Sequence, residues 1–155
     1  MQTSGADNKA IIRRLVEAGN SHDSATTISL VAPNAVLHML YDATDPLTLE
    51  RVGHEEEFNA EEMEKRIAHF KNMFSDDSAT IDQMFDVGGD MVLTMLTSTA
   101  MHKSGKKVTV QAISLDRIAD GKIAESWYLE DRLGYWQQLG IIPATSELMK
   151  KLADL

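Results

Sequence analysis

The segment "GKIAESWYLEDRLGYWQQLG", residues 121–140, is the most informative part of this chain. Its first half, 122–129, has the length and composition of a β-strand bounded by a glycine turn. Its second half starts with two acids, Glu130 and Asp131, and carries two large aromatic residues before it ends on Leu-Gly. We predict a strand that runs into a short helix, with the acids at the junction. An acid there either caps the helix or handles protons at the mouth of a pocket.

Three further strands are predicted before this one, over 79–87, 91–102 and 108–118. Each is followed by a turn that contains glycine, in the segments "GGD", "KSGKK" and "ADGK". Glycine adopts positive φ without strain, which suits tight connections between antiparallel strands. The second half of the chain is therefore expected to be an antiparallel meander.

The third of these strands changes its apolar phase along its length. Residues Val108, Val110 and Ala112 follow one alternation, and Ile113 and Leu115 follow the other. Such a slip indicates either a β-bulge or a strand that is apolar on both faces.

The first half of the chain is predicted to be mainly helical. We expect an amphipathic helix over Lys9–Gly19 capped by Asp7, a short helix within 24–32, a buried strand at 34–41 and a polar loop at 42–58. The clearest helix starts at Asn59, since Glu62 completes a pattern like a capping box. Its apolar stripe consists of Met63, Ile67, Phe70 and Phe74. A last helix is expected within "SELMKKLADL" at the C-terminus.

This order of elements predicts an α+β fold, in which the N-terminal helices pack on one face of a curved antiparallel sheet. A bent sheet closed by helices has the shape of a cone, and a cone can enclose a small-molecule pocket. The 155 residues suit one domain with a single core, which we place at about 9–142 with a C-terminal tail at 143–155.

Composition narrows the function further. The net charge of -9 argues against nucleic acid as a partner, and no apolar run is long enough to span a membrane. The chain has no cysteine and its N-terminus does not resemble a secretory signal, so we expect a cytoplasmic protein. Nine methionines suit an adaptable apolar interior that binds a hydrophobic ligand, although a methionine usually just fills gaps in a core.

The run "LDRIADGKIAESWYLEDRLGYWQQLG" resembles the C-terminal signature of SnoaL-like polyketide cyclases, within the nuclear transport factor 2-like superfamily. The matching positions are Arg117, Asp120–Ile123, Glu125, Trp127, Asp131 and Gln138–Gly140. The upstream strand that ends in His38 and the strand that ends in His102 also resemble elements of that family. Many SnoaL-like sequences carry His and Asp on either side of the Trp, where this chain has Ser126 and Tyr128.

The resemblance implies a cone-shaped, cystatin-like α+β barrel, a pocket inside the cone and a homodimer through the sheet. It also implies chemistry without a metal or cofactor, because family enzymes include aldol-type cyclases that need neither. The segment "HEEE" at 54–57 is the one cluster that invites a metal interpretation, and we expect it to be a solvated loop.

Four residues are candidates for catalysis. We take Asp131 as the general acid or base, with a pKa raised by an apolar surrounding, while a helix cap is the structural alternative. His38 and His102 are expected to polarise a carbonyl or pass a proton, although His38 equally fits a hydrogen-bonded core position. Tyr128 is expected to donate its phenol to a developing oxyanion.

The expected pocket surrounds these residues. Strand alternation places Ser126, Tyr128 and Glu130 on one face and Trp127 on the other, where it packs against a helix and shapes the wall. The predicted lining is Trp127, Ser126, Met95, Phe74, Tyr135 and Trp136.

We therefore expect a cofactor-independent enzyme that acts on a hydrophobic, carbonyl-bearing small molecule by general acid/base proton transfer. Ring closure of the polyketide cyclase type, isomerisation and dehydration are the reactions considered. The alternative is a non-catalytic module on the same fold that binds a small ligand or dimerises.

Overall fold

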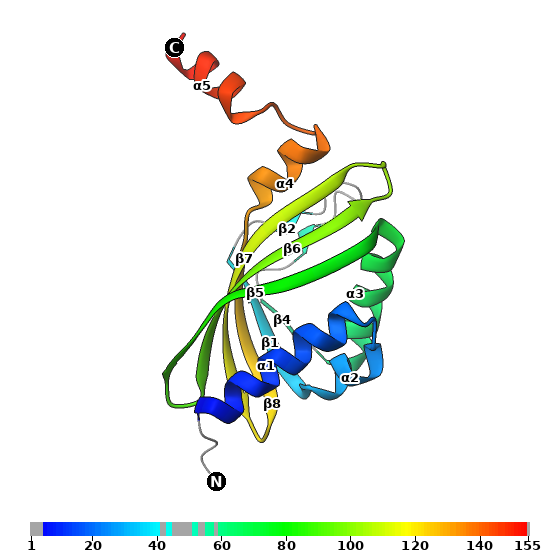
Figure 1. The fold of residues 1–155 in the computed structure, drawn as a ribbon, viewed down its shortest axis with the longest axis vertical. Helices are drawn as coiled ribbons and strands as arrows, with labels where there is room; N and C mark the ends of the chain where they lie inside the picture. The colour runs from blue at the N-terminus through cyan, green and yellow to red at the C-terminus, as the bar shows by residue number, and fades with distance from the viewer. Residues whose placement is uncertain (1–4, 41–42, 45–50, 53–54, 58, 155) are drawn as a thin grey trace.

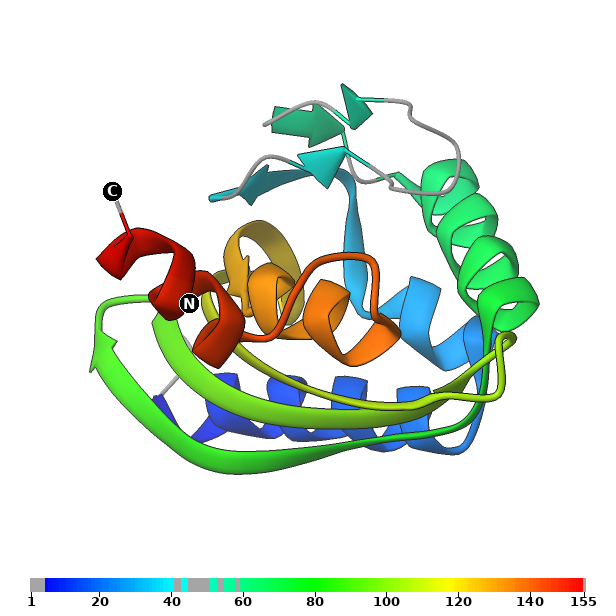
Figure 2. The same cartoon turned by 90° about the horizontal axis from the view of Figure 1, so that it is seen from above.

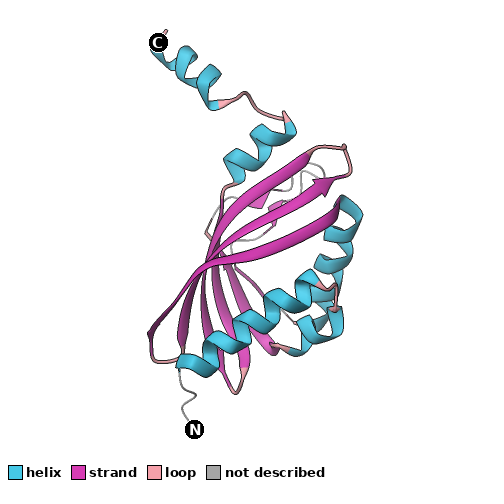
Figure 3. Cartoon of the chain, viewed as in Figure 1, coloured by secondary structure: helices cyan, strands magenta, loops and turns pink. Residues whose placement is uncertain are grey.

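The structure is a computed structural model, and it describes all residues except 1–4, 41–42, 45–50, 53–54, 58 and 155. The chain runs through α1 (Gly5–Asn20), α2 (Ser24–Ser29), β1 (Val31–Met39), β2 (Ala43–Thr44), β3 (Arg51–Val52), β4 (Glu55–Glu57), α3 (Ala60–Met73), β5 (Phe74–Gly88), β6 (Met91–His102), β7 (Lys107–Ala119), β8 (Lys122–Glu130), α4 (Arg132–Leu139) and α5 (Thr145–Ala153). The predicted α+β class and the C-terminal meander are confirmed (Figure 3).

Five long strands and the short β4 form one sheet in the order β4-β1-β8-β7-β6-β5. The four strands of the meander pair antiparallel, as predicted, but β1 joins β8 in parallel. The sheet is strongly curved and stays open, with β4 and β5 at its edges (Figures 1 and 2). It is therefore a cone with an open side rather than a closed barrel.

Helices cover the concave face of the sheet, which we call the inner face. Ile12 of α1 packs against Val92, Ile118 and Ile123 at one end of the sheet. Tyr135 and Leu139 of α4 pack against Ala100 and Val108 at the other end. Helix α5 extends away from the rest of the molecule (Figure 1).

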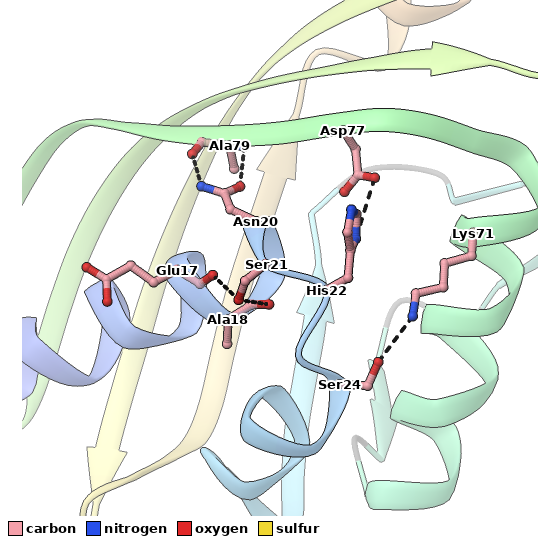
Figure 4. Close-up of polar contacts among 9 residues, drawn as sticks. All are labelled: Glu17, Ala18, Asn20, Ser21, His22, Ser24, Lys71, Asp77 and Ala79. Carbon is pink, nitrogen blue, oxygen red and sulfur yellow. Dashed lines mark hydrogen bonds and ion pairs between the residues drawn. The ribbon is translucent and has the colours of Figure 1, made fainter.

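The end of α1 is tied to the edge strand β5. The Asn20 side chain accepts a hydrogen bond from the Ala79 N–H at 2.7 Å and donates one to the Ala79 carbonyl oxygen at 2.9 Å (Figure 4). His22 next to it lies 3.9 Å from the Asp77 carboxylate. Asn20 thus attaches the end of α1 to the sheet. It also pairs backbone groups of the edge strand that would otherwise be free to pair with another chain.

Several local predictions need correction. Phe74, predicted at the end of the helical stripe, is the first residue of β5. Helix α1 begins at Gly5, so Asp7 lies in its first turn rather than at its cap. The predicted loop over 42–58 contains β2, β3 and β4, and the backbone of β4 pairs with β1; His54 lies outside the described residues. Strands of two or three residues are too short to show an alternation of polarity in the sequence. The Asn59 cap of α3 is confirmed by a 3.0 Å hydrogen bond from the Glu62 N–H.

Candidate active site

A group of polar side chains lies in the middle of the inner face, between the apolar clusters under α1 and α4. Its centre is Asp116 on β7, which lies directly opposite Ser126 on β8 and Val92 on β6. Thr94 and Tyr128 flank Ser114 in the next row across the same three strands. Since all of these side chains share the face of Val92 and Ile118, they point toward the helices and not toward the back of the sheet.

The Asp116 carboxylate is buried, and the residue is 5% exposed. Ser126 donates a hydrogen bond to Oδ1 at 2.6 Å, and Ser114 donates one to Oδ2 at 2.7 Å. Burial raises the pKa of the Asp116 carboxyl above its ordinary value, and the two serine hydrogen bonds only partly offset this effect. Its buried position and raised pKa are properties that suit a general acid or base.

The charge of Asp116 makes the stability of the protein depend on pH. Because its pKa is raised in the folded state, its stabilising contribution is complete below the unfolded pKa, about 3.9, and is lost as the pH rises through the folded value. We expect the melting temperature of the wild type, relative to an Asp116→Asn variant, to fall by a few degrees from about pH 4 to about pH 8. Parallel thermal melts of the two proteins measure this; a constant difference across that range would show that Asp116 keeps its ordinary pKa.

Tyr128 lies on the inner face together with Ser126, as alternation predicts. Its hydroxyl donates to Glu130 Oε2 at 3.1 Å, and the other carboxylate oxygen of Glu130 lies 2.7 Å from Arg132 Nε. The guanidinium of Arg132 in turn lies over the ring of Tyr135, 5.7 Å from its centroid. Of the two acids at the end of the strand, Glu130 is thus the one that turns inward.

Asp131 is exposed, so its predicted place in an apolar interior is wrong. Its side chain accepts a hydrogen bond from the Gly134 N–H at 2.8 Å and caps α4. A methyl group at Gly134 would collide with this carboxylate, so the glycine makes room for the cap. The predicted alternative, a cap of the following helix, is confirmed.

His38 lies on the outer face of the sheet, together with Trp127. The two rings stack with centroids 4.9 Å apart, and His38 Nε2 lies 2.9 Å from Glu125 Oε1. Arg117 donates to the other oxygen of Glu125 at 3.1 Å. The hydrogen bond with His38, followed by the one from Arg117, lowers the pKa of Glu125. These contacts connect β1, β8 and β7 on the outer face of the sheet. Trp127 was predicted to pack against a helix, but it stacks on His38.

His102 lies at the far end of the inner face, where its ring centroid is 5.4 Å from that of Phe74. The residue is 5% exposed, and burial followed by the charge of Lys103 lowers its pKa. Its Nδ1 accepts a hydrogen bond from the Ser104 N–H at 3.1 Å, which places the proton of the neutral ring on Nε2. Thr94 is eight residues away on the same strand, so roughly 27 Å separate His102 from the Asp116 region along the strand.

The four predicted catalytic residues are therefore not brought together. Of the predicted lining, Ser126, Phe74, Tyr135 and Trp136 lie on the inner side, whereas Trp127 and Met95 lie on the outer face. Asp116 and Thr94 were not identified as site residues from the sequence. The change of apolar phase in β7 was the signal for Asp116. It is not a bulge against β6, because the register of the two strands does not shift there; the inner face becomes polar at Ser114 and Asp116.

Among the described residues, no group of three or more His, Asp or Glu side chains is arranged to hold a metal ion. None of the described helices has the length and apolar character needed to cross a bilayer.

Comparison with known proteins gave one family and many similar structures. The family model for SnoaL-like polyketide cyclases matches residues 9–139. Wild-type IdmH, a candidate polyketide cyclase from Streptomyces antibioticus, is 27% identical and superposes with a TM-score of 0.72 over 86% of this chain and 98% of its own. A candidate polyketide cyclase from Bacillus cereus is 25% identical, with a TM-score of 0.69 over 88% of this chain and 82% of its own.

AclR, a candidate hydroxylase from Streptomyces galilaeus, shares the fold at 23% identity, with a TM-score of 0.76 over 97% of this chain and 94% of its own. The comparison with curated proteins gave no match.

Proposed function

This chain belongs to the SnoaL-like polyketide cyclase family, and from that premise we propose that it is a cyclase-type enzyme for a hydrophobic, carbonyl-bearing small molecule. The observation that carries the proposal is the buried Asp116 carboxylate on the inner face, held by two serines. A buried carboxylate with a raised pKa is matched to the removal of a weakly acidic proton from carbon.

In the proposed reaction, Asp116 takes the proton from the carbon next to a carbonyl group. The C–H electron pair becomes the C=C bond of an enolate, and the carbonyl π pair moves to oxygen. In ring closure the enolate carbon then attacks a second carbonyl of the same molecule, and protonated Asp116 returns its proton to the new alkoxide. In isomerisation the proton returns to a different carbon. Either sequence balances without an oxidant, a reductant or a cofactor.

Ser114 and Ser126 act as positioning residues in this scheme. Each holds one oxygen of Asp116, so the carboxylate is oriented before a substrate arrives. Such pre-organisation avoids part of the reorganisation that a free carboxylate would undergo during proton transfer.

The proton-transfer step can be tested before the natural substrate is known. With 2-tetralone in heavy water, we expect the protein to catalyse the exchange of the protons next to the carbonyl, followed by ¹H NMR. The uncatalysed exchange in buffer is the baseline. If 2-tetralone binds but its exchange stays at that baseline, the enzyme hypothesis is rejected in favour of a non-catalytic module that binds a small ligand.

We also propose that two copies pair through the outer face of the sheet. Met95, Ile113 and Leu129 lie directly opposite one another on β6, β7 and β8, and they are 36%, 41% and 43% exposed. Phe85 on β5 adds a fourth large apolar side chain, at 45% exposed. A contiguous apolar row of this kind on a charged protein indicates a protein interface, and a second copy offers the identical, self-complementary row.

A further inference from the structure

The side chain of Thr94 lies on the inner face with an unused hydroxyl group. The residue is 0% exposed, and its Oγ1 has no hydrogen-bond partner. Buried hydroxyl groups in folded proteins nearly always have one, because an unpaired group pays its full desolvation cost. Valine has almost the same shape as threonine and would fill this position without an unpaired hydroxyl. The hydroxyl of Thr94 is therefore not explained by packing, and we look for a role in binding or catalysis.

The register places this hydroxyl next to the proposed base. Thr94 lies directly opposite Ser114, and Ser114 donates to Asp116 two residues further along β7. Thr94 and Asp116 are therefore diagonal neighbours on one face of an antiparallel pair, at positions that lie roughly 7–8 Å apart along the backbones. Side chains at neighbouring positions of this kind can reach both ends of the reacting part of an enolising ketone, its α-carbon and its carbonyl oxygen.

Tyr128, the donor predicted from the sequence for this role, is already engaged. The hydroxyl of Tyr128 donates to Glu130, which is itself paired with Arg132. The hydroxyls of Ser114 and Ser126 donate to Asp116. Thr94 differs from these three because its proton is not committed within the described residues.

We propose that Thr94 is a further catalytic residue, whose hydroxyl donates a hydrogen bond to the oxygen of the enolate that Asp116 generates. This inference rests on the proposed proton transfer. It also defines the substrate class more closely as a ketone whose enolisable C–H and carbonyl oxygen both enter the buried row between β6 and β7. When Asp116 removes the proton, negative charge develops on the oxygen opposite Thr94, in a place shielded from water. A pre-placed donor has its largest effect there.

The test uses Thr94→Val, which removes the hydroxyl and keeps the shape, and Thr94→Ser, which keeps the hydroxyl. Loss of one such donor typically lowers turnover by 10²–10³, so we expect 2-tetralone exchange to slow by about 100-fold in Thr94→Val, with little change in KM. Thr94→Ser should restore most of the rate. The melting temperature of Thr94→Val should rise by roughly 2–6 °C, because the unpaired buried hydroxyl is gone.

Binding of 2-naphthol, a stable planar analogue of the enol of 2-tetralone, gives a readout that does not depend on turnover. We expect its affinity to fall roughly 5–10-fold in Thr94→Val and to recover in Thr94→Ser, as measured by naphthol fluorescence.

If Thr94→Val exchanges 2-tetralone and binds 2-naphthol as well as the wild type does, Thr94 does not have the proposed role. The role of Asp116 would be unaffected by that result. A melting temperature that falls together with the rate would also overturn the role of Thr94, since the hydroxyl would then have a structural partner. The proposed function itself fails in a different experiment, if replacement of Asp116 leaves exchange unchanged.

Discussion

Asp116→Asn is expected to lower the rate of 2-tetralone exchange by roughly 10³-fold, within the range of 10²–10⁴ that a positioned general base contributes. Asparagine has the shape of aspartate and still accepts a hydrogen bond through its amide oxygen, but it cannot take up a proton at neutral pH. The side chain is buried and held by two serines, so the substitution leaves the packing in place. Rates from ¹H NMR and melting curves of the same samples separate the lost base from a lost fold.

Asp131→Asn is the matched control for this experiment. It removes the same charge fifteen residues away, at the exposed cap of α4, and asparagine is as good a helix cap as aspartate. We expect its exchange rate to stay within about twofold of the wild type, since it leaves the inner face untouched. The reverse outcome, with exchange lost in Asp131→Asn and kept in Asp116→Asn, would return the base to the position first predicted from the sequence.

The two acids at the end of β8 show where sequence reasoning about this site was limited. Alternation correctly placed Ser126, Tyr128 and Glu130 on one face and Trp127 on the other. The same alternation argues against an inner place for Asp131, since it assigns residue 131 to the face of Trp127. In the structure Asp131 lies just beyond the end of β8 and caps α4.

The sequence alone did not identify Asp116, because its hydrogen-bond partners are brought to it by strand pairing. Ser114 is two residues away, but Ser126 lies on the next strand, ten residues along the chain. The helix that packs beside it on Val92 and Ile118 is α1, which lies more than a hundred residues earlier in the sequence. The meander itself was predictable, since each of its turns contains glycine, and Gly88, Gly89, Gly105 and Gly121 all have positive φ.

The parallel pairing of β1 with β8 is the feature of the fold that the local pattern could not supply. Strands that are consecutive in sequence pair through short turns, whereas β1 reaches β8 across most of the chain. The pairing places His38 next to Trp127 on the outer face. A histidine expected near the pocket therefore lies on the outer face of the sheet, where it contacts Trp127 and Glu125.

Ile113→Arg is expected to convert the proposed homodimer into a monomer. Ile113 is the centre of the apolar row on the outer face, with Met95 and Leu129 as its direct neighbours. In a pairing of two identical faces, the substitution places two like charges in an apolar interface, and the loss of a central anchor typically costs 2 kcal/mol or more. We therefore expect the dissociation constant of the dimer to rise by at least about 100-fold, measured by analytical ultracentrifugation over a range of concentrations.

Met149→Arg is the control for this variant, because Met149 is 57% exposed on α5 and lies outside the sheet. It adds the same charge and should dimerise like the wild type. Because Asp116 and Thr94 lie on the opposite face from Ile113, a monomeric Ile113→Arg protein should keep its exchange activity per chain. A wild type that stays monomeric at high concentration, or an Ile113→Arg variant that dimerises as the wild type does, would mean that the outer face is not the interface. The apolar row would then have to be covered by something other than a second copy of the chain.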